Sequence, residues 1–230
     1  MTSPTFSRAL IVGAGSGLSA SLARLFAREG MQIALAARDV GKLGALCKET
    51  GARAHACDAA KPEEVAALFS DLDKAGAPDV VVYNASGRVR GPFVDLDPAD
   101  VKRAIEVTAY GAFLVAREAA RRMAPKKHGA ILFTGASAGV KGYPQSAPFA
   151  MGKFALRGLA QSMARELHPQ GIHIAHFVID GGIARADRAP SGPDALLDPD
   201  AIAANYLNVL RQPRSAWTWE MELRPWVEKF

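Results

Sequence analysis

The 230-residue sequence contains only two cysteines, Cys47 and Cys57, and neither belongs to a cluster with metal-ligand spacing. Such sparse cysteine usage is typical of proteins from a reducing compartment, so we expect neither a disulfide nor a metal site. A run of about 18 apolar residues, as a membrane span requires, is also missing. The apolar stretch from Arg8 to Ala20 is too rich in glycine for a signal peptide and suits a first strand. These absences predict a soluble, cytoplasmic protein.

The sequence also lacks a concentrated basic patch, although its net charge is +5 and its isoelectric point is near 9.4. Its densest basic group, at 121–128, falls where a long helix should end, and cations at that position complement the helix dipole. Nucleic-acid sites instead gather basic and aromatic residues in one stripe. We therefore predict no nucleic-acid partner, while an anionic cofactor suits a basic protein.

The remaining composition is that of a globular protein, with 49% hydrophobic and 22% charged residues and no internal repeat or linker. Short β-branched runs alternate with longer segments of helical periodicity along the whole chain. This alternation predicts an α/β fold over residues 1–230. The predicted domain is a single Rossmann-like, doubly wound parallel sheet of about seven strands with helices on both faces. Ligands of such sheets bind at the carboxyl ends of the strands.

The first predicted strand breaks into three alternating glycines, Gly13, Gly15 and Gly17, before a helical pattern begins at Leu18. Glycines let the backbone turn sharply and approach a ligand, while the free N–H groups and the dipole of a helix start favour negative charge. We predict that this loop, with Ser16 and Leu18, binds the pyrophosphate of a dinucleotide. The alternative is an ordinary strand-to-helix turn, because glycine serves wherever φ is positive.

The second predicted strand ends at Arg38 and Asp39. In a dinucleotide-binding fold, the side chain at this position contacts the adenosine ribose. A carboxylate there binds the ribose hydroxyls and indicates NAD, whereas an arginine accommodates the 2′-phosphate of NADP. Arg38 is the stronger match, and Asp39 also suits the N-cap of the next helix. We therefore expect NADP(H) as the preferred cofactor, with NAD(H) as the alternative.

In order and spacing these motifs resemble the short-chain dehydrogenase/reductase family over nearly the whole chain. The family's TGxxxGxG segment is similar to residues 12–19, with Val12 in place of the leading threonine and Ser19 in place of the last glycine. The resemblance implies further cofactor contacts. These are Asp58 against the adenine, Asn84 from an NNAG-like segment, and Gly181 from a Pro-Gly-like pair after the sixth strand.

The catalytic motifs depart from the family pattern, which combines an Asn on a long helix, a Ser after the fifth strand and the Tyr and Lys of YxxxK. Thr108 stands at the Asn position, and Ala136 stands at the Ser position with Ser137 beside it. The YxxxK segment runs from Phe149 to Lys153, so only its lysine remains. In the family that lysine holds the nicotinamide ribose and lowers the pKa of the tyrosine, but Phe149 has no proton to deliver.

Three side chains are candidates to replace the missing acid, and each has a purely structural alternative. Tyr143, in the loop before the active-site helix, is the first candidate, although such a tyrosine also packs a loop. Ser137 is a hydrogen-bond donor but a poor acid, and it also suits a turn. Lys153 is an acid if burial lowers its pKa, or else a solvated or ribose-bound lysine. Tyr110 is expected to pack within the long helix.

The resemblance implies an NADP(H)-dependent oxidoreductase with non-standard chemistry, acting on a small carbonyl compound or enone. An enone is included because hydride addition to carbon leaves an enolate, which demands less of an acid. The alternative is a catalytically silent NADP(H)-binding protein that acts as a sensor or a partner subunit.

Two further segments each keep two interpretations. Residues 185–199 form either a substrate lid or a surface loop. Three tryptophans crowd the end of the chain and either mark a subunit interface or pack the last strand: Trp217, Trp219 and Trp226. Family relatives commonly form dimers or tetramers, so we expect a homodimer or homotetramer.

Overall fold

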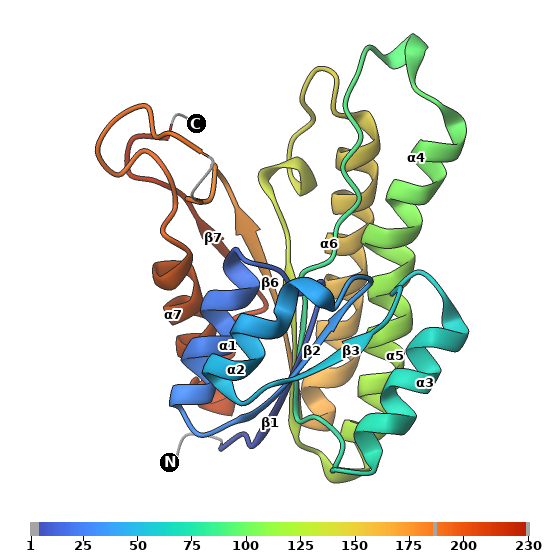
Figure 1. The fold of residues 1–230 in the computed structure, drawn as a ribbon, viewed down its shortest axis with the longest axis vertical. Helices are drawn as coiled ribbons and strands as arrows, with labels where there is room; N and C mark the ends of the chain where they lie inside the picture. The colour runs from blue at the N-terminus through green and yellow to red at the C-terminus, as the bar shows by residue number, and fades with distance from the viewer. Residues whose placement is uncertain (1–4, 186–187, 229–230) are drawn as a thin grey trace.

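Seven parallel strands form one sheet in the computed structural model, which describes residues 5–185 and 188–228 (Figure 1). The strands are β1 (Arg8–Val12), β2 (Gln32–Ala37), β3 (Arg53–Ala56), β4 (Val80–Tyr83), β5 (Gly129–Thr134), β6 (Ile172–Ile179) and β7 (Glu220–Leu223). Their order in the sheet is β3-β2-β1-β4-β5-β6-β7, and every neighbouring pair is parallel. The predicted doubly wound parallel sheet is therefore confirmed.

Helices cover both faces of the sheet (Figure 1). One face packs against α1 (Leu18–Arg28), α2 (Gly44–Thr50) and α7 (Pro199–Leu210). The other face packs against α3 (Pro62–Asp73), α5 (Gly111–Met123) and α6 (Ala147–Leu167), with α4 (Pro98–Ile105) extending α5 beyond the sheet. Alternate strand residues supply the two cores, so that Ile11 and Leu10 point to opposite faces. Both faces are buried, which explains the continuous apolar runs in the strands.

A π-helical turn, Glu106–Tyr110, lies between α4 and α5. Thr108 points inward from this turn, and its Oγ1 accepts a hydrogen bond of 2.9 Å from the Gly87 N–H. Tyr110 stacks on Phe113 of α5, which agrees with the prediction that it packs within the long helix. Its side chain is nevertheless 45% exposed, because it lies about half a helical turn from the inward-facing Thr108.

The carboxyl ends of the strands meet at one edge of the sheet, where the strand order reverses between β1 and β4. The glycine loop after β1 and the segments that follow β4, β5 and β6 therefore lie close together. None of the described helices is both long enough and apolar enough to cross a membrane.

Candidate functional site

Gly13 lies where the loop after β1 touches the segment after β4. Its φ is +82°, and a Cβ at this position would lie 2.4 Å from the backbone nitrogen of Ala85. The Asn84 amide donates to Ser19 Oγ at 2.7 Å, and that hydroxyl donates to the Gly13 carbonyl at 3.0 Å. Ser19, which replaces a family glycine, thus closes a polar chain that holds the loop in place. In this structure Asn84 is therefore a support for the loop.

The rest of the glycine loop is open. A Cβ on Gly15 or on Gly17 would meet no atom within 4 Å. Ser16 is exposed, and the helix α1 begins at the buried Leu18 with Gly17 as an N-cap that offers no side-chain hydrogen bond. The first amides of a helix need acceptors from outside it, and an anion meets that need. The open loop and the uncapped helix start therefore fit a pyrophosphate.

A cavity of about 590 Å³ adjoins the loop and includes Gly13, Arg38, Asp58 and Asn84 in its lining. Asp39 is engaged locally, since its carboxylate accepts the Gly41 N–H at 3.0 Å and lies 3.3 Å from Lys42. Arg38 is exposed at the cavity wall and is the group available for a ribose phosphate. The cavity brings four of the predicted cofactor residues together.

Asp58 is held in its charged form at this cavity. Burial opposes ionisation, but hydrogen bonds from the Arg103 guanidinium and the Ala60 N–H outweigh it and hold the pKa of Asp58 below its usual value. Arg103 belongs to α4, so this ion pair also ties that helix to the end of β3. Both carboxylate oxygens are engaged, since Oδ1 accepts the Ala60 N–H and Oδ2 accepts a hydrogen bond from Arg103.

Phe149 and Lys153 lie one turn apart on α6, with the Lys153 Nζ 5.7 Å from the centre of the Phe149 ring. The ammonium nitrogen donates to the Thr134 carbonyl at 2.7 Å, at the end of β5. Only 3% of Lys153 is exposed, so the interpretation of a solvated lysine is wrong. Burial, and then the nearby charge of Arg88, lower the pKa of Lys153 to about 7. Lys153 therefore holds its proton weakly at neutral pH.

Arg88 is a residue of this centre that the sequence did not reveal. Its guanidinium carbon lies 4.9 Å from the centre of the Phe149 ring, which places a cation over the ring from the segment after β4. The available signal was the pair Arg88 and Arg90, two residues apart and directly after the NNAG-like segment at a strand's carboxyl end. Nothing in the local pattern linked that pair to α6.

The other candidate acids lie in the segment after β5. Ser137 begins a 3₁₀ turn, Ser137–Gly139, and is half-buried. Tyr143 is 42% exposed and lies beside Lys141, whose Nζ is 5.7 Å from the centre of the tyrosine ring. A hydrogen bond with Tyr143, together with the charge of Asp180, raises the pKa of Lys141. The structure thus joins Tyr143 to Lys141 rather than to Lys153.

Asp180 and Gly181 occupy the end of β6, where the family has a Pro-Gly pair. The Asp180 carboxylate is buried, 3.5 Å from Lys141 and 3.3 Å from Arg224. Gly181 has a φ of +148°, and a Cβ there would lie 2.7 Å from the Pro225 ring. Residues from the tail of the chain therefore pack directly against this corner of the site.

Residues 7–189 match the family model described as short chain dehydrogenase. The chain belongs to the short-chain dehydrogenase/reductase family. It is 34% identical over 212 residues to short chain aldehyde dehydrogenase 1 of Euphorbia lathyris, covering 88% of this chain and 72% of that protein. It also resembles a short-chain dehydrogenase structure from Rhodopseudomonas palustris, with 36% identity, a TM-score of 0.83 and coverage of 97% and 100%. A metagenomic short-chain oxidoreductase in complex with NADP is 30% identical, with a TM-score of 0.83 and coverage of 95% and 97%.

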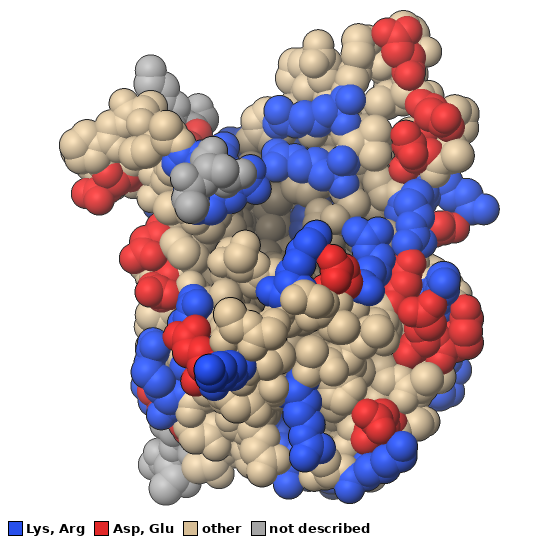
Figure 2. All heavy atoms as spheres, in the orientation of Figure 1, with Lys and Arg blue, Asp and Glu red and all other residues tan. Residues whose placement is uncertain are grey.

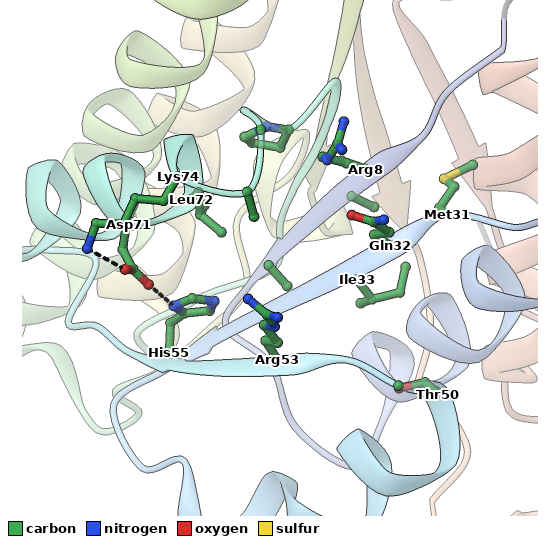
Figure 3. A pocket seen from close by; sticks show the side chains of 16 residues that line it. Arg8, Met31, Gln32, Ile33, Thr50, Arg53, His55, Asp71, Leu72 and Lys74 are labelled. Carbon is green, nitrogen blue, oxygen red and sulfur yellow. Dashed lines mark hydrogen bonds and ion pairs between the residues drawn. The ribbon is translucent and has the colours of Figure 1, made fainter.

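A second hollow in this short-chain dehydrogenase/reductase chain, of about 550 Å³, lies at the opposite end of the sheet (Figure 3). It is bordered by Arg8 and Gln32, at the starts of β1 and β2, and by His55 and Asp71. The Asp71 carboxylate lies 3.3 Å from His55 Nδ1 and 3.0 Å from Lys74 Nζ. Ligands of doubly wound sheets bind at the carboxyl ends of the strands, which is the end of the sheet where the glycine loop lies.

Proposed function

We propose that this chain is an NADP(H)-dependent oxidoreductase of the short-chain dehydrogenase/reductase type with a degenerate catalytic centre. The observation that carries the proposal is the combination of an open glycine loop, a cavity lined by Arg38, and a buried Lys153 beside Phe149. Arg38 favours NADP(H), and NAD(H) is the alternative. The NADP complex of the metagenomic relative supports the same choice.

The predicted cofactor residues bind different parts of NADP(H). Arg38 binds the 2′-phosphate and Asp58 accepts a hydrogen bond from the adenine. Asn84, Gly181 and Lys153 surround the nicotinamide half, with Lys153 leaving the Thr134 carbonyl for the ribose hydroxyls. The pyrophosphate binds to the loop formed by Gly13, Gly15, Ser16, Gly17 and Leu18.

The substrate in this proposal is a small carbonyl compound or an enone. When bound, NADPH supplies a hydride to the electrophilic carbon. Tyr143 donates its phenolic proton to the resulting alkoxide or enolate, and the Lys141 ammonium stabilises the phenolate that forms. Because Tyr143 is exposed, water restores its proton. Ser137 donates a hydrogen bond to the substrate oxygen, and Lys153 is the second candidate for the acid.

Two measurements test this proposal. Calorimetric titration with NADPH and NADH should show tighter binding of NADPH, and Arg38→Leu should remove the difference. Single-turnover oxidation of bound NADPH should then proceed with at least one member of a panel of aldehydes, ketones and enones. Absence of NADPH binding, or binding without hydride loss to any compound of the panel, would contradict it.

The second candidate is a catalytically silent NADP(H)-binding protein, a sensor or partner subunit. It is favoured by three positions where the family's catalytic side chains are replaced, Thr108, Ala136 and Phe149. In this case the native chain should bind NADPH without turnover. The double variant Phe149→Tyr with Ala136→Ser should gain carbonyl reductase activity, since the cofactor and Lys153 are already in place. A native chain that turns over would exclude this candidate.

We also propose that the chain forms a homodimer or homotetramer in the cytoplasm. The surface that supports assembly is an apolar stripe on the π-helical turn, α5 and α6, where each side chain is 45–52% exposed: Tyr110, Phe113, Met151 and Phe154. Aromatic residues and Met are enriched at subunit interfaces. Trp217 instead stacks on His173 at 4.5 Å, and Trp219 lies under Arg157, so packing of the last strand accounts for both.

A further inference from the structure

Three arginines gather near Phe149, beyond the carboxyl ends of the strands. Arg88 and Arg90 come from the segment after β4, and Arg188 comes from the segment after β6. Burial and the charges of neighbouring arginines lower the pKa of Arg88, and the contributing residues are Arg90, Arg188 and Arg185. Lys and Arg side chains lie on both sides of the hollow at this end of the molecule (Figure 2). Strands that are distant in the sequence therefore bring like charges to one place.

No carboxylate neutralises these three arginines among the residues that the structure describes. Elsewhere in the same chain arginines do pair, as Arg157 does with Glu220 at 2.6 Å and Arg122 with Asp73 at 2.8 Å. All three side chains are exposed, and like charges gathered in one place repel one another. An arrangement of this kind is stabilised by a bound anion.

The backbone that carries Arg88 is fixed at both ends. The Gly87 N–H donates to Thr108 Oγ1 at 2.9 Å, and the Gly91 N–H donates to the Gln145 carbonyl at 3.3 Å. The Phe149 ring then supports the Arg88 guanidinium from below. A guanidinium held in this way is prepared to bind an oxyanion with two hydrogen bonds.

The cofactor's own phosphates have other partners in the proposed function. The pyrophosphate fits the open loop at Gly15 and the start of α1, and the 2′-phosphate fits Arg38. Arg88 instead lies over Phe149, the residue at the position of the family's proton donor.

We infer that the substrate carries an acidic oxyanion group, a carboxylate or a phosphate, which Arg88 binds beside Phe149 while Arg90 and Arg188 attract it at the rim. This inference rests on the proposed function, because it places the substrate beside Phe149. It adds that Arg88 determines specificity by the charge of the substrate and orients the reactive carbon.

The test compares size-matched probes on the protein saturated with NADP⁺, so that binding is measured without reduction. The probes are 4-carboxybenzaldehyde, its neutral methyl ester and 4-formylphenyl phosphate. Calorimetric titration at low salt should give an affinity for at least one anionic probe that is about ten- to hundredfold above that of the ester. A tighter carboxylate probe indicates a carboxylic acid substrate, and a tighter phosphate probe indicates a phosphorylated one.

Arg88→Met should remove most of this preference while leaving the affinities for the ester and for NADP⁺ unchanged. Arg53→Met is the matched control, since Arg53 is an exposed arginine of β3 that borders the hollow at the opposite end of the sheet. It should keep the full preference. Thermal unfolding of both variants confirms that they are folded.

Equal affinity for the ester and both anions would overturn the inference and leave the proposed function intact. An Arg88→Met variant that loses NADP⁺ affinity but keeps the probe preference would also overturn it, because the arginine would then serve the cofactor. Failure of NADP⁺ to bind, with the anionic probes still preferred by the free protein, would reject the proposed function while supporting the arginine site.

Discussion

Gly13 and Gly15 belong to the same loop but have different surroundings. Gly13→Ala places a methyl group against the Ala85 backbone at a positive φ, so it should destabilise the fold by about 2–4 kcal/mol. Gly15→Ala enters open space and should change the stability by less than about 0.5 kcal/mol, but it should weaken NADPH binding at least about tenfold. Urea unfolding and NADPH titration check both variants. Unchanged NADPH affinity in Gly15→Ala would show that the pyrophosphate does not bind at this loop.

Lys153 should make stability depend on pH in the alkaline range. Its pKa is lowered in the folded state to about 7, so between pH 7 and about 10 the unfolded chain binds the extra proton and folding becomes more favourable as the pH rises. From pH 7 to pH 9 the wild type should therefore gain about 2 kcal/mol relative to Lys153→Met. Urea unfolding of both proteins at the two pH values measures this gain, and parallel curves would contradict it.

Tyr143 should matter for reduction only through its hydroxyl. Tyr143→Phe keeps the ring beside Lys141 but removes the proton, so single-turnover NADPH oxidation should slow by about 10²- to 10⁴-fold. Tyr110→Phe is the matched control, because Tyr110 has a similar exposure but lies on the π-helical turn. An unaffected rate in Tyr143→Phe would transfer the role of acid to Lys153.

Among the elements, β6 should make the fold sensitive to acid. It is buried at every residue and contains His173, whose Nε2 donates to the Thr218 carbonyl at 2.9 Å and whose pKa burial lowers to about 4. Below about pH 6.5 this histidine binds a proton in the unfolded chain but stays neutral in the folded chain. The free energy of unfolding therefore falls as the pH falls toward 4.

This histidine alone should destabilise the wild type by about 2 kcal/mol at pH 5 relative to pH 7.5. His173→Phe keeps a ring to stack on Trp217 and should lose this part of the pH dependence. Urea unfolding at the two pH values provides the measurement. An equal loss of stability in the variant would show that His173 is already protonated in the folded state.

The elements were predictable where local pattern and burial agree. The strand β4 (Val80–Tyr83) is a continuous apolar run and is buried at every residue, as a strand covered on both faces requires. The π-helical turn at Glu106–Tyr110 could not be predicted, since it shifts hydrogen bonds by one residue without changing the helical composition. Asp39 illustrates an intermediate case, because its carboxylate accepts the Gly41 N–H but the N-cap of the helical turn that follows is Val40.

The candidate site was predictable in its parts that follow strand ends, and not in its long-range contacts. The glycine loop, Arg38 and Asp58 converge on one cavity because all follow the carboxyl ends of parallel strands. The contact between Arg88 and Phe149 joins positions 61 apart in number, and only the packing of the π-helical turn and α6 on the segment after β4 creates it. No periodicity encodes such a contact.

For the whole molecule, the apolar stripe should govern assembly. The double variant Phe113→Glu with Phe154→Glu places charges on both α5 and α6, so light scattering after size exclusion should show a smaller oligomer at micromolar concentration. Phe93→Glu is the matched control, because Phe93 is 78% exposed but lies outside the stripe. An unchanged mass in the double variant would place the interface elsewhere.

The contacts of Asp180 with Arg224 and of Gly181 with Pro225 bear on how the protein should be handled. A purification tag or fluorescent label attached after residue 228 would lie beside the corner of the candidate site that Asp180 and Gly181 form. Such an attachment would compete with a ligand or disturb the contacts of Asp180 with Lys141 and Arg224. Attachment before β1, whose start lies at the far edge of the sheet, leaves that corner undisturbed and is the better choice for every titration described above.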